Sequence, residues 1–93
     1  MTSTIVRHRR EHLHAQQGGH CFWCCRVVPL GQATLDELMP RGRGGTQSWD
    51  NIVMSCKPCN GGRGNDIAPA WARAFVMARE ALRLRFPQYT RSQ

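Results

Sequence analysis

Four of the five cysteines in this 93-residue chain form two Cys-x-x-Cys pairs, Cys21/Cys24 and Cys56/Cys59. Two such pairs supply four thiolates that can surround one ion tetrahedrally, as zinc prefers, and soft thiolates select zinc over magnesium. Zinc binding of this kind contributes on the order of 10 kcal/mol to folding, which is enough to hold a small domain together. We therefore expect a structural zinc site, with the fifth cysteine, Cys25, as a free thiol.

Between the cysteine pairs, two adjacent acids, Asp36 and Glu37, lie near the end of an apolar segment and precede a basic, glycine-rich loop at 40–50. Neighbours on a regular strand point to opposite faces, so both acids can chelate one ion only if the strand ends or bends there. The alternative is a division of labour, in which Asp36 binds a hard cation through oxygen and Glu37 reaches a water molecule. Taken alone, the pair also fits a solvated strand end.

The spacing of these residues resembles the four-cysteine branch of the HNH endonucleases, which have the ββα-metal (His-Me finger) fold. The matching residues, in chain order, are Cys21-x2-Cys24, Leu35-Asp36-Glu37-Leu38-x-Pro40, Gly44-Gly45, Asn51-Ile52 and Cys56-x2-Cys59-Asn60-x2-Arg63. The resemblance covers about residues 18–66, and residues 67–86 resemble the helix that often follows this motif. It implies an α+β fold with a β-hairpin and a helix around a metal.

The resemblance also implies a role for single positions. Asp36 and Asn60 would hold one catalytic divalent metal, Mg²⁺ or Mn²⁺ or another, on the scissile phosphate, and Asn51 would brace the loop and orient the base. Glu37 stands where the family keeps the histidine that deprotonates the attacking water. Such enzymes cut phosphodiesters to leave a 5′-phosphate and a 3′-hydroxyl.

Glu37 is the main departure from the family pattern. Histidine is a useful base because its pKa lies near working pH, whereas a glutamate ordinarily has a pKa of about 4.3 and is a weaker base. Three outcomes are open: Glu37 is the base of a variant nuclease, it joins Asp36 in metal binding, or the site is impaired and the protein only binds. All four histidines precede this segment, so none is an evident replacement.

The charge of the chain favours a polyanionic partner. Thirteen Lys plus Arg against six Asp plus Glu give a formal net charge of +7. Lys57 is the only lysine, and the planar fork of arginine suits bidentate phosphate contacts. DNA is the first candidate and RNA is not excluded, although a merely soluble basic protein has the same composition. The candidate nucleic-acid contacts are Arg7, Arg9, Arg10, Arg41, Arg43 and Arg63.

The elements that must position these residues form a single domain over 1–93, namely a basic N-terminal helix at 1–17, the zinc and ββα-metal core at 18–66, and a C-terminal helix at 67–86. The N-terminal helix has few apolar residues, so it is either a docking arm for phosphates or a frayed terminus. Within the core, strands at 27–30 and 33–39 are predicted to form the hairpin. Residues 60–64 contain three glycines, which makes them a poor helix.

The C-terminal helix has the clearest periodicity. Its apolar residues recur at three- and four-residue steps, which predicts a stripe packed on the core. The stripe consists of Trp71, Phe75, Ala78, Leu82 and Phe86.

Some classes of protein are disfavoured. The first twenty residues lack the apolar core of a signal peptide, and no stretch approaches the ~18 apolar residues of a membrane span. We therefore expect a cytoplasmic setting, where paired cysteines bind metal, with no membrane partner and no small-molecule substrate.

The function expected from these residues is metal-dependent hydrolysis or nicking of DNA. The alternatives are a catalytically impaired zinc module that binds DNA or RNA, and a protein-interaction zinc domain, which would leave Asp36, Asn51 and Asn60 without a role. The target, the choice between monomer and homodimer, and service to a phage, a mobile element, restriction or repair are left open.

Overall fold

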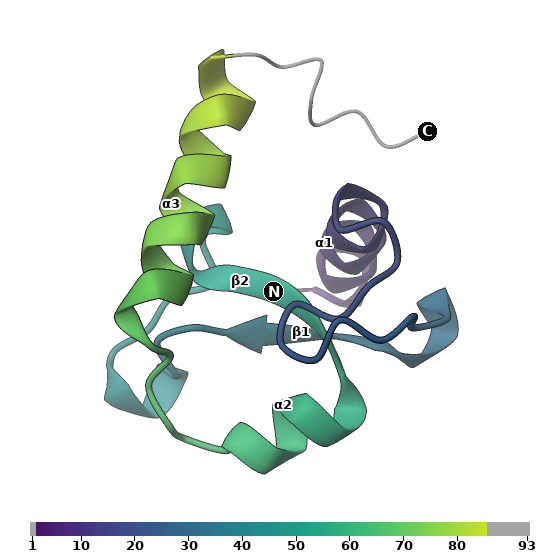
Figure 1. The fold of residues 1–93 in the computed structure, drawn as a ribbon, viewed down its shortest axis with the longest axis horizontal. Helices are drawn as coiled ribbons and strands as arrows, with labels where there is room; N and C mark the ends of the chain where they lie inside the picture. The colour runs from purple at the N-terminus through teal and green to yellow at the C-terminus, as the bar shows by residue number, and fades with distance from the viewer. Residues whose placement is uncertain (1, 86–93) are drawn as a thin grey trace.

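A computed structural model describes residues 2–85 as a small α+β domain, which confirms the predicted fold class. In chain order its helices and strands are α1 (Ser3–Gln16), β1 (Ala33–Glu37), β2 (Ile52–Cys56), α2 (Lys57–Arg63) and α3 (Ala70–Arg85). The strands and α2 form the ββα core, and α1 lies on the opposite side of the sheet from α2 (Figure 1). None of the helices described is long and apolar enough to cross a bilayer.

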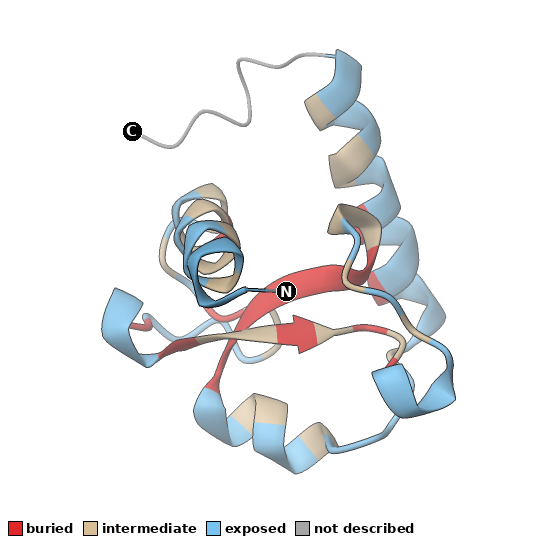
Figure 2. Cartoon of the chain, turned by 180° about the vertical axis from the view of Figure 1, so that it is seen from behind, coloured by how far each residue is buried: buried red, intermediate tan, exposed pale blue. Residues whose placement is uncertain are grey.

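The two strands pair antiparallel, with Ala33 opposite Cys56 and Glu37 opposite Ile52. The predicted hairpin between 27–30 and 33–39 is therefore wrong. Every residue of β2 is buried (Figure 2), whereas Val27 is 73% exposed and makes only an isolated bridge with His20. Pairing with β2 wins because it removes far more apolar surface from water.

Helix α1 is a regular helix that contacts the core through one buried side chain near its end, so the frayed-terminus interpretation is wrong. The Thr2 hydroxyl caps its first turn, and Gly18 and Gly19 end it at positive φ. Its one fully buried side chain, Leu13, packs in the cluster that contains Met54 of β2. The Gln17 amide accepts from Met54 N–H at 2.8 Å and donates to Met54 C=O at 2.9 Å. It thereby pairs backbone groups of β2.

Helix α2 forms over Lys57–Arg63 although its glycines make it a poor helix by propensity. Pro58 lies in its first turn, where a missing N–H costs nothing. The helix carries Cys59 toward the other three paired cysteines. Tertiary contacts therefore outweigh the local preference.

The predicted core stripe of α3 is wrong about which face packs. The buried residues are Ala72 and Val76, which cluster with Leu38 and Val53. The stripe residues are exposed, by 60% at Trp71, 62% at Phe75 and 50% at Leu82, while Phe86 lies outside the described residues. The buried face is thus the one that carries the smaller Ala72 and Val76, which the spacing of the larger apolar residues does not reveal.

Trp49 joins the two terminal helices. The Arg9 guanidinium of α1 lies 4.8 Å from the ring centroid, and that of Arg83 of α3 lies 5.6 Å from it. His12 of α1 meets the ring edge-on at 5.0 Å. Arg79 of α3 donates to the Trp49 carbonyl at 2.9 Å. Helices α1 and α3 therefore both contact Trp49.

Leu13→Ala is expected to lower the free energy of unfolding by about 2–5 kcal/mol, because it leaves a cavity in the core beneath α1. Leu82→Ala, on the exposed stripe of α3, is the matched control and is expected to cost much less. Urea titrations followed by circular dichroism, with zinc present, measure both losses. Equal losses would contradict the burial of Leu13 and the exposure of Leu82.

Candidate zinc centre and active site

The four paired cysteines come together as predicted. The sulfur atoms of Cys21, Cys24, Cys56 and Cys59 all lie within 4.8 Å of one another, and those of Cys24 and Cys56 are 3.8 Å apart. Tetrahedral zinc with bonds of about 2.3 Å requires sulfur separations of about 3.8 Å. The cluster therefore fits a structural metal such as zinc. Cys25 is an exposed free thiol with a left-handed backbone, φ 66°.

Proton affinities within the cluster differ strongly. Burial raises the pKa of the Cys21 thiol, but hydrogen bonds from the backbone of Cys24, Cys56 and Trp23 outweigh it and lower the pKa to about 7. Burial and the neighbouring thiols raise the pKa of Cys59 to about 12. A cation at the centre would favour the thiolate form and so oppose the rise in the pKa of Cys59.

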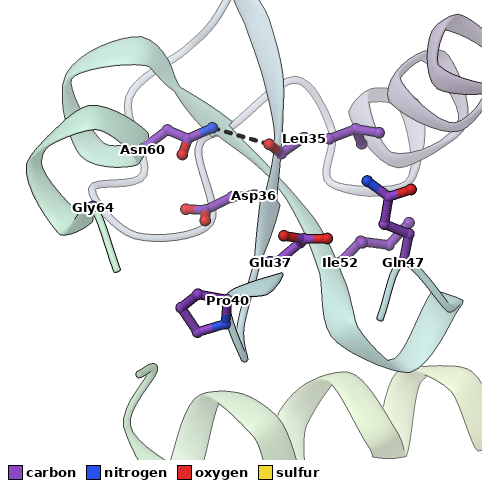
Figure 3. Close-up of a pocket in the computed structure, with 8 residues that line it drawn as sticks. All are labelled: Leu35, Asp36, Glu37, Pro40, Gln47, Ile52, Asn60 and Gly64. Atoms are coloured by element: carbon purple, nitrogen blue, oxygen red, sulfur yellow. Dashed lines mark hydrogen bonds between the residues drawn. The ribbon is translucent and has the colours of Figure 1, made fainter. Parts of the chain in front are cut away.

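A second site lies at the end of β1, where a pocket of about 170 Å³ is lined by Asp36, Glu37 and Asn60 among others (Figure 3). The two acids are the last residues of β1, and both line this pocket. Asn60, from α2, donates through Nδ2 to the Leu35 carbonyl at 2.9 Å and to the Thr34 hydroxyl at 3.0 Å. These bonds leave its side-chain oxygen on the side of Asp36 (Figure 3).

Asp36 is buried, with an exposed fraction of 5%, and its carboxylate accepts hydrogen bonds from three donors. Its Oδ1 accepts from Arg63 at 2.8 Å, and its Oδ2 accepts from the Trp23 indole at 2.9 Å and from the Ser55 hydroxyl at 3.3 Å. A carboxylate offers about four lone-pair positions, so one at Oδ1 is left for a further ligand.

Arg63 faces inward, although the sequence suggested a phosphate contact. Besides the ion pair with Asp36, it donates to the Asp66 carbonyl at 2.9 Å and lies 4.5 Å from the centroid of the Trp23 ring. Its described contacts make it a support of Asp36.

Glu37 has a buried carboxylate oxygen, Oε2, with no hydrogen-bond partner within the described chain. Leaving such an atom unsatisfied costs about 1–3 kcal/mol, so a water molecule or a bound ligand is expected to supply its partner. With Asp36 and Asn60, the pocket offers an oxygen-only donor set. Such a set fits a hard divalent cation such as Mg²⁺ or Mn²⁺.

Asn51 ties together the loop that follows Glu37. Its Oδ1 accepts from Met39 N–H at 2.8 Å, and its Nδ2 donates to the Met39 carbonyl at 3.0 Å and to the Thr46 carbonyl at 2.5 Å. Gly45 passes so close that an added Cβ would lie 1.7 Å from the Met39 oxygen. The loop is thus fixed two residues beyond Glu37.

The remaining arginines of the predicted set differ in exposure. Arg7, Arg41 and Arg43 are exposed, although Arg43 also donates to the Asn65 carbonyl at 3.0 Å. Arg9 and Arg10 are partly buried, and Arg9 donates to the carbonyl of Gln47, which lines the pocket. Helix α1 therefore reaches the rim of the pocket.

Sequence reasoning missed Trp23 and Ser55 as contacts of Asp36, and Gln47 as a pocket residue. Trp23 is thirteen positions from Asp36 and Ser55 nineteen, and neither spacing carries a motif. A correct pairing of β1 with β2 would have indicated that Ser55 lies near Asp36, because it places Ser55 opposite Thr34 on the strand that carries Asp36.

A four-cysteine metal cluster beside a ββα unit that presents two acids and an amide defines a ββα-metal domain. The family model described as HNH endonuclease matches residues 21–76, and the chain belongs to this family. Over 59 residues the chain is 30% identical to the CRISPR-associated endonuclease Cas9 of Corynebacterium diphtheriae. That match covers 62% of this chain and 5% of the relative.

Proposed function

We propose that this chain is a metal-dependent endonuclease that hydrolyses or nicks DNA phosphodiester bonds, with Glu37 as the general base. The observation that carries the proposal is the unpartnered Oε2 of Glu37 in the pocket that also contains Asp36 and Asn60. Membership of the HNH family and the endonuclease name of the relative support the reaction class. The net charge of +7 supports a nucleic-acid substrate.

In this proposal, Asp36 and Asn60 would hold the divalent cation, which would supply Lewis-acid stabilisation of charge at the scissile phosphate. Glu37 Oε2 takes a proton from a water molecule in the pocket. The water oxygen bonds to phosphorus, the bond from phosphorus to O3′ breaks, and O3′ takes up a proton from solvent. The products are a 5′-phosphate and a 3′-hydroxyl.

The surrounding residues would position rather than react. Asn51 holds the loop after Glu37 and so limits the movement of its backbone. The exposed arginines Arg7, Arg41 and Arg43 would contact backbone phosphates, which fix register without reading sequence. Zinc in the cysteine cluster would hold the frame of the site.

The test is incubation of purified, zinc-loaded protein with supercoiled plasmid, with Mg²⁺, Mn²⁺ or a chelator. Conversion to the nicked or linear form only with the divalent cation is the expected result. No conversion with any divalent cation, alongside salt-sensitive binding, would overturn the enzyme proposal.

The second candidate is a catalytically impaired module that binds DNA or RNA. It is favoured by the glutamate at position 37 and by the ion pair that already occupies part of the Asp36 carboxylate. Binding of a labelled duplex, weakening steeply with salt and unaffected by Mn²⁺, is the result that would support it.

A further inference from the structure

We propose that Trp23, which lies inside the first cysteine pair, is a positioning residue for Asp36 and thereby sets the affinity of the pocket for its divalent cation. The use of that cation in cleavage rests on the function proposed above. The positioning role concerns metal binding alone.

Trp23 is held in place at two points. It lies between Cys21 and Cys24, whose sulfurs belong to the metal cluster, so its backbone is fixed when zinc is bound. Its ring packs edge-on against Phe22, with centroids 4.8 Å apart, and against Trp71 of α3 at 6.2 Å. The indole is therefore held from its backbone and from its ring.

The plane of the Asp36 carboxylate depends on its hydrogen bonds. The torsion that turns a carboxylate is broad and weakly restrained, so hydrogen bonds must fix its plane. At Oδ2 the Trp23 N–H bond is 2.9 Å long, whereas the Ser55 bond is 3.3 Å and weaker. Trp23 is thus the stronger of the two donors at this oxygen.

Arg63 competes with Trp23 for the carboxylate of Asp36. Its guanidinium holds Oδ1 at 2.8 Å and stacks on the Trp23 ring at 4.5 Å. If the indole N–H is removed, Asp36 can turn so that both oxygens meet the planar guanidinium, the favoured bidentate geometry. That turn rotates the carboxylate plane, so the free lone pair at Oδ1 changes direction and no longer faces the same part of the pocket. Trp23 therefore keeps Arg63 monodentate and fixes the direction in which Oδ1 can meet a cation.

The experiment compares Trp23→Phe, which keeps an aromatic ring but has no N–H, with Trp71→Phe as the matched control. Trp71 belongs to the same aromatic cluster but makes no described hydrogen bond to Asp36. Zinc content is measured by mass spectrometry, and Mn²⁺ affinity by the paramagnetic resonance signal of free Mn²⁺, without substrate. Trp23→Phe is expected to retain zinc and to bind Mn²⁺ about 10–100-fold more weakly. Trp71→Phe is expected to bind Mn²⁺ like the wild type.

A kinetic readout separates positioning from a general loss of structure. In Trp23→Phe, the Mn²⁺ concentration for half-maximal nicking should rise while the rate at saturating Mn²⁺ recovers. If Trp23→Phe fails to fold, benzothienylalanine at position 23 replaces the N–H by sulfur and keeps the ring shape. Unchanged Mn²⁺ affinity in the folded variant would overturn the positioning role and leave the endonuclease proposal standing. If the wild type binds Mn²⁺ but does not cleave DNA, the endonuclease proposal is overturned and the positioning role stands. If the wild type does not bind Mn²⁺, both proposals are overturned.

Discussion

Glu37→Ala is expected to slow plasmid nicking by about 10²–10⁴-fold, the range that a positioned general base contributes. The expected loss follows from the pocket, because Oε2 of Glu37 is buried there without a hydrogen-bond partner in the described chain. Single-turnover rates with saturating Mn²⁺ measure the effect. Zinc content should be unchanged, because Glu37 is not part of the cysteine cluster.

Three further variants sharpen this prediction. Glu37→Gln keeps the size of the side chain and removes its basicity, so it should be as inactive as Glu37→Ala. Glu37→His restores the residue type that the family keeps, and it should retain or raise activity. Glu11→Ala removes an exposed acid of α1 and is the matched control. Full activity in Glu37→Ala would rule out Glu37 as the base, and a loss of Mn²⁺ affinity would make it a metal ligand instead.

Removal of the metal from the cysteine cluster is expected to unfold the chain. The free energy of zinc binding, on the order of 10 kcal/mol, is as large as the whole stability of a typical domain, about 5–15 kcal/mol. The cluster ties β2 and α2 to the segment that carries Trp23, so its loss separates the parts of the core. Chelation at neutral pH, followed by far-ultraviolet circular dichroism, measures the effect.

Two cysteine variants provide the comparison for this experiment. Cys56→Ser should reproduce the chelated state even with zinc present, whereas Cys25→Ser should keep zinc and fold because Cys25 lies outside the cluster. Re-addition of zinc should restore the signal of the chelated wild type. A chelated protein that keeps its native spectrum would show that the metal is dispensable for folding.

Spacing along the chain was sufficient to predict the cysteine cluster and the helices at both ends, whereas the ββα core was expected only from the resemblance to a family. The cluster and the helices depend on short-range geometry: two residues between thiolates, and glycines after a helix. The three pocket residues Asp36, Glu37 and Asn60 also came from spacing, through the resemblance to a family. Their catalytic roles remain a prediction.

Spacing failed where the outcome depends on distant partners. The strand at 33–37 pairs with buried β2 and not with the nearer segment at 27–30, because pairing follows the apolar surface that it buries. Helix α3 packs through Ala72 and Val76 against Leu38 and Val53, so the size of its apolar residues does not decide which face is buried. Trp23 and Arg63 could not be linked to Asp36 because no local pattern encodes a contact between separate elements.

The position of Trp49 has a consequence for how the molecule opens. The Trp49 indole contacts Arg9 and His12 of α1 and Arg83 of α3. If either helix moves away, the indole loses part of the packing that holds it against the other helix. We therefore expect the first and last helices described to open together, although they are the elements farthest apart in sequence. Local opening of either helix would then carry the free-energy cost of loosening both, and the backbone amides of α1 and α3 are expected to exchange with solvent together.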